Sequence, residues 1–232
     1  MLHFNKKLTS YVIGRTSGRC SSTRENARYF IFGKHNQQYS YTMGGYAPAG
    51  TVLKSEEVEK DVGVMVHQSL KPSKQCATAA AKANQVLGQM SRALSYRDRV
   101  TWIRLYKIYV RHHLEYSVQS WSPWTDADRD VLEDVQKRVI RMTLGLSSLN
   151  YEDRLREVGL TTLQARRERG DMIQVWKYLN HKQAVDPSKL FTLQSDVATR
   201  VTRAAVAPLT LADQPFRGEI RRNFFTIRVI RA

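Results

Sequence analysis

Basic side chains recur at helical spacing between residues 82 and 111, and their chemistry is the binding of phosphate groups. Lysine and arginine donate charge-assisted hydrogen bonds to phosphate oxygens, and glutamine adds neutral ones. No acid occurs between Arg99 and His113, so like charges repel along this stretch unless an anion is bound. An ordinary solvated helix face is the alternative. The candidate nucleic-acid-binding residues are Lys82, Gln85, Gln89, Arg92, Arg97, Arg99, Arg104, Lys107 and Arg111.

A second group of residues begins like a calcium-binding loop. Asp126, Asp128 and Asp130 have the spacing of the first three ligands. Val131 stands where that loop needs glycine, however, and Lys137 stands where it needs the final glutamate. The sequence therefore predicts no calcium site.

The histidine pair at positions 112 and 113 is the other candidate for metal binding, together with Glu115. Adjacent residues on a helix project about 100° apart, so His112 and His113 cannot easily share one ion. The chain also has no Walker A loop, no HExxH and no GxSxG. We therefore expect neither a metal ligand set nor a catalytic residue, and interpret the chain as a basic, mostly helical binding module.

The totals favour a folded protein with a polyanionic partner. The 232 residues include 37 lysines and arginines against 21 acids, a formal net charge of +16, and 42% of the residues are hydrophobic. The hydrophobic content is typical of a packed protein, while the charge favours nucleic acid first and an anionic membrane surface second. No run of eighteen apolar residues occurs, so the sequence predicts no transmembrane helix. The basic helix faces favour nucleic acid over a membrane surface, and we expect no membrane partner.

Cysteine usage and the N-terminal composition bear on the compartment. Cys20 and Cys76 have no CxxC spacing, which favours a reducing compartment, and we expect a cytoplasmic or nuclear location. Glu25 is the only acid among the first thirty residues, a composition that resembles a mitochondrial transit peptide. Apolar residues there follow no helical spacing, so an unstructured leader over residues 1–28 is the preferred interpretation.

The elements that must position the basic residues are mainly helices. The predicted fold class is α+β, predominantly helical, with segments at 1–28, 29–70, 71–120, 121–183 and 184–232, the last a loop-rich basic tail. The predicted strands are a β-hairpin of Tyr29–Phe32 with Tyr39–Met43, a short strand Val62–Val66 with a bulge or close backbone approach at Gly63, and an edge strand at Ile227–Arg231. The predicted helices begin at Pro72, run from about Asp98 to Glu115, follow Thr125, occupy 151–157, and extend from a cap at Thr161 to Leu179.

Each long predicted helix has an apolar face at alternating spacings of three and four residues. These faces are Cys76, Ala80, Ala83, Leu87, Met90 and Leu94; Trp102, Ile103, Tyr106, Tyr109, Val110 and Leu114; Leu132, Val135, Val139, Met142 and Leu146; and Met172, Ile173, Trp176 and Leu179. The first helix adds a stripe of small residues, which lets another surface approach closely. Either a packed helix or the shallow minor groove of an A-form duplex fits this stripe, which comprises Ala81, Asn84, Gly88, Ser91 and Ser95.

Three segments resemble one known family in the order of their motifs. They are YSYTMGG followed by VEKDVGVMV, then LYKIYVRHHLEYSVQSWSPW, then VQKRVIRM with YEDRLREVGLTTLQARRERGDMIQVWKYL. Together they resemble the C-terminal part of reverse transcriptases of Jockey-like LINE (non-LTR) retrotransposons, from about Tyr29 to Ala232. The W-N-x-L-P segment of that family would come next after Ala232, so the resemblance predicts a truncated end.

The resemblance implies a role for each region. Tyr29–Val66 would be the last palm strands, with Asp61-Val62-Gly63-Val64 matching a motif near the primer 3′ end, although Val62 replaces the usual leucine. Helices from Pro72 would be the thumb that contacts the template–primer duplex, and later helices the connection. Polymerisation in this family needs palm aspartates that hold two magnesium ions, and no adjacent Asp-Asp pair occurs in this chain.

Three functions remain open from the sequence. The first is a fragment that binds RNA or an RNA–DNA duplex without polymerising, with no cofactor of its own, because magnesium would bind only with the missing palm, and with no small-molecule substrate. The second is part of an active reverse transcriptase whose palm is missing from this gene model. The third is a translated remnant of a dead element.

Overall fold

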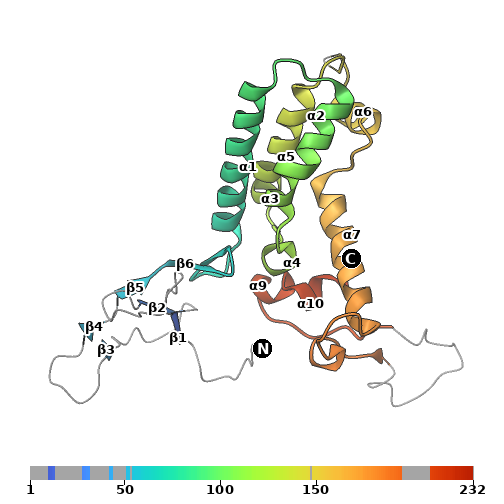
Figure 1. The fold of residues 1–232 in the computed structure, drawn as a ribbon. Helices are drawn as coiled ribbons and strands as arrows, with labels where there is room; N and C mark the ends of the chain where they lie inside the picture. The colour runs from blue at the N-terminus through green and yellow to red at the C-terminus, as the bar shows by residue number, and fades with distance from the viewer. Residues whose placement is uncertain are drawn as a thin grey trace, which may run out of the picture. The chain divides into compact units, whose positions relative to one another are not determined.

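The computed structural model describes residues 10–13, 28–31, 42–43, 51–52, 54–146, 148–194 and 210–231. The chain divides into two compact units, Met1–Gln75 and Cys76–Ala232. Strands lie in the first unit and nearly all helices in the second (Figure 1), so the fold is α+β and predominantly helical, as the sequence predicts.

The strands of the first unit pair differently from the predicted hairpin. β2 (Arg28–Ile31) lies in a three-stranded sheet between β1 (Ser10–Ile13), which is antiparallel to it, and β5 (Lys54–Glu56), which is parallel. β3 (Thr42–Met43) pairs instead with β4 (Thr51–Val52). The sequence of β1, SYVI, is rich in the aromatic and β-branched residue types that favour strands, so it competes with Tyr39–Met43 for pairing with β2. The prediction of an unstructured leader is therefore wrong for residues 10–13; its other residues, except Arg28, lie outside the described part.

The motif Asp61–Val64 forms the tip of a hairpin. β6 (Val58–Asp61) and β7 (Val64–His67) are antiparallel, with Asp61 opposite Val64. Val62 and Gly63 connect them with φ of 43° and 86°, the positive values of a two-residue type I′ turn. Gly63 thus serves a turn rather than a bulge, and Val62, a β-branched residue in this region, is strained.

Helix α1 (Ser73–Ala93) has the predicted start and the predicted buried face. The Gln75 side chain, which ends the first unit, accepts a hydrogen bond from Met65 N at 2.8 Å and so joins the helix start to β7. Met90 and Leu94 are half-buried, and the rest of the predicted stripe is buried together with Ala79: Cys76, Ala80, Ala83 and Leu87. Burial also raises the pKa of the Cys76 thiol to about 12, so this side chain is an inert core group.

The second predicted helix is continuous in sequence but contains a π-helical turn. It comprises α2 (Arg99–Leu105), the π-turn η2 (Tyr106–Val110) and α3 (Arg111–Glu115). Asp98 caps it, accepting a hydrogen bond from Thr101 N that lowers the pKa of the Asp98 carboxyl. The π-turn rotates the following residues relative to a regular helix, so Tyr109 is 52% exposed and its predicted burial is wrong. The remaining predicted positions are buried: Trp102, Ile103, Tyr106, Val110 and Leu114.

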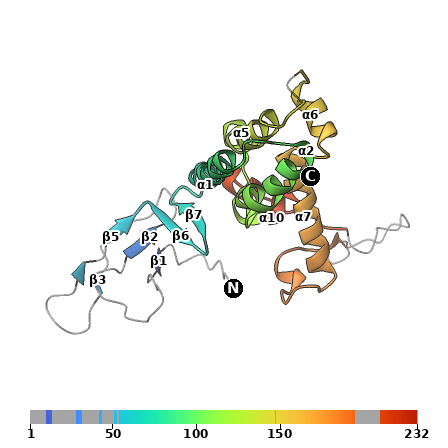
Figure 2. The ribbon, with the colours of Figure 1, turned by 45° about the horizontal axis from the view of Figure 1, so that its top comes forward.

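Helix α5 (Asp126–Arg141) forms side-chain hydrogen bonds with neighbouring helices. Thr125 caps it as predicted, accepting from Asp128 N. Tyr106 Oη donates to Gln136 Oε1 at 2.7 Å, and Trp102 Nε1 donates to the Val139 carbonyl at 3.0 Å. α5 also lies beside α1 in both Figure 1 and Figure 2. The core of the second unit therefore forms between α1, α2 and α5.

Helix α7 (Leu163–Leu179) begins one residue later than predicted and buries a different face. Thr162, not Thr161, caps it by accepting from Ala165 N. The predicted inward residues Met172, Ile173 and Trp176 are 43–56% exposed, and Leu179 is half-buried. The buried positions are Leu163, Arg167, Asp171 and Val175. Asp171 is buried here because Arg228 of the C-terminal tail binds it, whereas Arg167 is buried with one nitrogen unpaired among the described residues.

The C-terminal tail belongs to the core of the second unit. The predicted edge strand is instead helix α10 (Phe225–Arg228), which follows α9 (Glu219–Arg222). Val175 of α7 packs with Phe191, Phe225 and Val229 in one hydrophobic cluster. Burial of these side chains favours the helical turn over a solvent-exposed strand. The remaining short elements are α4 (Val118–Trp121), α6 (Tyr151–Glu157, as predicted) and η3 (Pro187–Lys189).

Candidate nucleic-acid interface

The polar face of α1 is open to solvent as the sequence predicts. Because the apolar stripe faces the core, residues on the opposite side of the helix must face outward. Lys82, Gln85, Gln89 and Arg92 are all exposed. Within the described part of the chain neither Lys82 nor Arg92 forms an ion pair. This helix therefore presents two cations and two neutral donors at spacings of three and four residues.

The basic stripe of α2, η2 and α3 contains side chains in different environments. Arg104 and Lys107 are exposed and, among the described residues, have no acidic partner. Arg111 is half-buried and lies 3.8 Å from Glu115, measured from Nε to Oε2. Glu115 is also bound by Nε and Nη2 of Arg166. Arg111 is thus part of an ion-pair network within the fold, and its contact with nucleic acid stays a prediction.

Arg97 is also a structural residue. Its Nη2 donates to the Ser91 carbonyl at 3.1 Å and to Ser91 Oγ at 2.9 Å. The guanidinium lies 5.4 Å from the centre of the Trp102 ring, a cation–π contact. These bonds hold the loop between α1 and α2, so Arg97 is not free to bind an external phosphate.

Arg99 occupies an intermediate position. Its Nη1 is 2.8 Å from Glu157 Oε2, and both side chains are about half exposed. An exposed pair of this kind contributes little to stability and is weakened by salt. Arg99 can therefore exchange its carboxylate for a phosphate at small cost, but it starts with a partner.

Of the residues predicted for the interface, four are cations that are exposed and have no acidic partner among the described residues. We call Lys82, Arg92, Arg104 and Lys107 the exposed cations. They come from two helices whose packing is set by the buried faces described above. The sequence predicted all four from spacing and sign of charge.

The structure adds one titratable group that the sequence did not nominate for this surface. His113 of α3 has a pKa below its ordinary value of about 6.5, because partial burial disfavours the imidazolium and because His112 and Lys82 add positive charge nearby. Lys82 and His113 therefore lie close together although they belong to different helices. The acid-free run from Arg99 to His113 was the signal in the sequence.

The stripe of small residues on α1 is partly used for packing within the protein. Asn84 Oδ1 accepts from Arg138 Nη1 of α5 at 3.1 Å, and Ser91 binds Arg97. Gly88 is half-buried, whereas Ala81 and Ser95 are exposed. Close packing between helices thus explains the middle of the stripe, leaving its ends open.

The primer-end motif lies at the β6–β7 turn of the first unit, with Val62 80% exposed. The exposed cations belong to the second unit. The primer-end motif and the exposed cations therefore belong to different units of the fold.

Comparison of the chain with family models, with curated proteins and with solved structures gives no match. Over the residues that the structure describes, no group of three histidine, cysteine, aspartate or glutamate side chains could hold a metal ion. Nor, over the same residues, is any helix long and apolar enough to cross a membrane.

Proposed function

We propose that this chain is the duplex-binding thumb and connection of a LINE-type reverse transcriptase, which binds RNA or RNA–DNA duplexes without polymerising. The resemblance in three ordered sequence segments supports the family. The exposed cations support the activity, because unpaired lysine and arginine side chains on a folded surface attract phosphates and release counterions from them.

The single observation that carries the proposal is the separation of paired from unpaired cations. Arg97, Arg111 and Arg166 are held by protein partners. Lys82, Arg92, Arg104 and Lys107 are exposed and have no such partner within the described chain. Like charges at these spacings repel when no anion is present, so a bound polyanion stabilises the arrangement.

The neutral donors of α1 favour a duplex recognised by its backbone. Gln85 and Gln89 alternate with the cations of α1 and can donate to phosphate or ribose oxygens. Contacts of this kind carry no base information, so we expect binding with little sequence preference. Tyr96, Tyr109 and Tyr116 are also exposed and can stack on unpaired bases, which makes single-stranded RNA the competing ligand.

Equilibrium binding to three probes of equal length tests this function. We expect an RNA–DNA hybrid and double-stranded RNA to bind more tightly than single-stranded RNA in fluorescence anisotropy titrations at fixed salt. The A-form minor groove displays 2′-hydroxyls and backbone that neutral donors can reach. Equal affinity for all three probes, or no binding, would overturn the proposal of a duplex site.

A primer-extension assay with magnesium distinguishes the binder from an active polymerase. We expect no templated synthesis, because the chain has no adjacent aspartates to hold the two metal ions. Any extension that depends on the template would instead support the second function left open by the sequence. A cooperative thermal melt of the purified chain, in turn, argues against the third, a remnant without a stable fold.

A further inference from the structure

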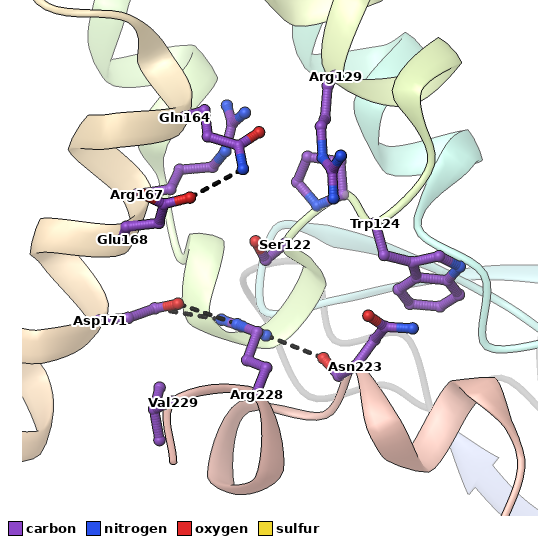
Figure 3. A pocket seen from close by; sticks show the side chains of 11 residues that line it. Ser122, Trp124, Arg129, Gln164, Arg167, Glu168, Asp171, Asn223, Arg228 and Val229 are labelled. Carbon is purple, nitrogen blue, oxygen red and sulfur yellow. Dashed lines mark hydrogen bonds and ion pairs between the residues drawn. The ribbon is translucent and has the colours of Figure 1, made fainter. Parts of the chain in front are cut away.

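The second unit contains a small pocket whose lining includes none of the exposed cations. It has a volume of about 180 Å³ and is lined by residues of α5, α7 and the α9–α10 segment. Figure 3 shows Arg129, Arg167 and Arg228 around it, each from a different helix. Three arginines converging on one pocket are unusual unless carboxylates or an anion neutralise them.

Arg167 is the residue without a partner. Its side chain lines the pocket although the residue is only 5% exposed, and its Nη1 is buried with no hydrogen-bond partner among the described residues. Burial lowers the pKa of Arg167, and the charge of Arg129 lowers it further, while Glu133 acts in the opposite direction. A buried guanidinium nitrogen left unpaired is costly, so an acceptor in the pocket would satisfy a real deficit.

The two carboxylates that line the pocket, Asp171 and Glu168, already accept hydrogen bonds from other side chains. Asp171 is held by both Nε and Nη2 of Arg228, at 2.9 and 3.1 Å. Glu168 is exposed and accepts from Gln164 Nε2 at 2.8 Å (Figure 3). The two acids and three arginines that line the pocket leave a net charge of one positive unit.

Arg129 is the most available of the other two arginines. Among the described residues its one ion pair is with Asp126, whose side chain is 92% exposed, so the pair is weak. Arg228, in contrast, is fully used: besides Asp171 it donates to the carbonyls of Gln119 and Asn223, both at 3.2 Å. Arg167 and Arg129 are thus the arginines with hydrogen-bonding capacity left for an anion. Arg228 instead connects α10 to α7 through Asp171.

From these observations we propose that the pocket binds a phosphate group through Arg167 and Arg129. Guanidinium forks match the oxygen spacing of phosphate and bind it bidentately. The volume is well below the ~300 Å³ at which pockets for drug-sized ligands begin, so a single phosphate fits better than a whole nucleotide. The Ser122 hydroxyl, on the same wall, offers a further neutral donor. This inference does not rest on the proposed duplex binding.

Two sources of phosphate share this chemistry, namely free inorganic phosphate and the terminal phosphate of an oligonucleotide. Isothermal titration in chloride buffer at constant ionic strength compares sodium phosphate, a 5′-phosphorylated dinucleotide and the same dinucleotide with a 5′-hydroxyl. Saturable binding of phosphate alone points to the free anion. Tighter binding of the phosphorylated dinucleotide than of either other probe points to a nucleic-acid end. Both results support the site.

Variants connect the binding to the pocket. We expect Arg167→Gln to weaken phosphate binding at least tenfold and Arg129→Gln to weaken it severalfold. Arg169→Gln, on the exposed side of the same helix, is the matched control and should change it less than twofold. Because Arg129 lies near the surface, its variant keeps the test valid even where Arg167→Gln fails to fold. The proposal is overturned by no binding of either phosphate probe at about 10 mM, roughly ten times a millimolar Kd, or by equal affinity in all variants.

Discussion

The second unit holds two groups of cations with opposite environments. On α1, α2 and η2 the exposed cations face solvent and have no acidic partner among the described residues. Around the pocket, Arg228 is tied to a buried carboxylate, and Arg167 is buried with one nitrogen unpaired. Both groups consist of basic side chains, but they differ in exposure and in pairing, and this difference separates a docking surface from a structural network.

The difference predicts where mutation harms folding and where it harms binding. In the pocket, Arg228 contributes to stability through fixed hydrogen bonds. On the open helices the exposed cations contribute to association, because a solvated charge adds little to folding. The following variants and conditions test whether the two groups of cations differ in this way.

The largest effect is expected from Arg228→Met. The variant leaves Asp171, 6% exposed, as an unpaired buried charge, so we expect a loss of about 3–5 kcal/mol in the free energy of unfolding. Arg99→Met, which removes an exposed pair with Glu157, should cost at most about 1 kcal/mol. Urea unfolding of both variants at neutral pH measures the difference. Equal losses would remove the distinction between the two groups.

A smaller effect, of opposite sign, is expected from Arg167→Met in phosphate-free buffer. Methionine removes the unpaired buried nitrogen and keeps most of the side-chain volume. We therefore expect unchanged stability or a gain of about 1–2 kcal/mol. The same urea titration checks it. A loss above about 2 kcal/mol would show that Arg167 has an essential partner within the fold, in contradiction to its unpaired state.

The smallest effect concerns pH and the histidine beside Lys82. Because the pKa of folded His113 lies below its ordinary value of about 6.5, the unfolded chain binds a proton before the folded chain does as the pH falls. His113 therefore contributes stability that is present above pH 6.5 and is lost as the pH falls through its folded pKa. We expect wild type to lose more stability between pH 7 and pH 5.5 than His113→Gln, by less than about 1 kcal/mol.

Nucleic-acid binding should show the reverse pH trend on the same surface. A proton on His113 adds one cation near Lys82, so affinity for a duplex should rise below pH 6.5 in wild type. The rise should be smaller in His113→Gln. Identical pH profiles for the two proteins would place His113 away from the bound duplex.

Local spacing was sufficient to predict the helices whose faces are uniform. The buried stripe of α1 and its exposed polar side follow a regular period, and Asp98 and Thr125 cap their helices by local hydrogen bonds. The exposed cations follow from the same period, since a residue opposite a buried face must be exposed. For this part of the candidate site the sequence contained the necessary information.

Other positions depend on contacts that local spacing does not contain. Tyr109 was expected inside, but the π-turn shifts the register of the helix after Tyr106. On α7 the apolar residues suggested the wrong inner face, because Asp171 is buried by Arg228, 57 residues later. Arg111 was expected in a basic stripe closed by Glu115, and the structure adds that Glu115 is also bound by Arg166 of α7. Long-range ion pairs and a helical insertion therefore account for these three differences.

The central claim is that the exposed cations bind duplex phosphates, and the salt dependence of affinity tests it most directly. The logarithm of the affinity for an RNA–DNA hybrid should fall linearly with the logarithm of the salt concentration. Changing all four exposed cations to glutamine should flatten this slope by about 3.6, because each phosphate contact contributes ~0.9. The four are Lys82, Arg92, Arg104 and Lys107. The matched control changes four exposed cations elsewhere, Lys182, Lys189, Arg217 and Arg222, to glutamine. We expect its slope to stay within about one unit of wild type. Equal flattening in both variants, or in neither, would contradict the account.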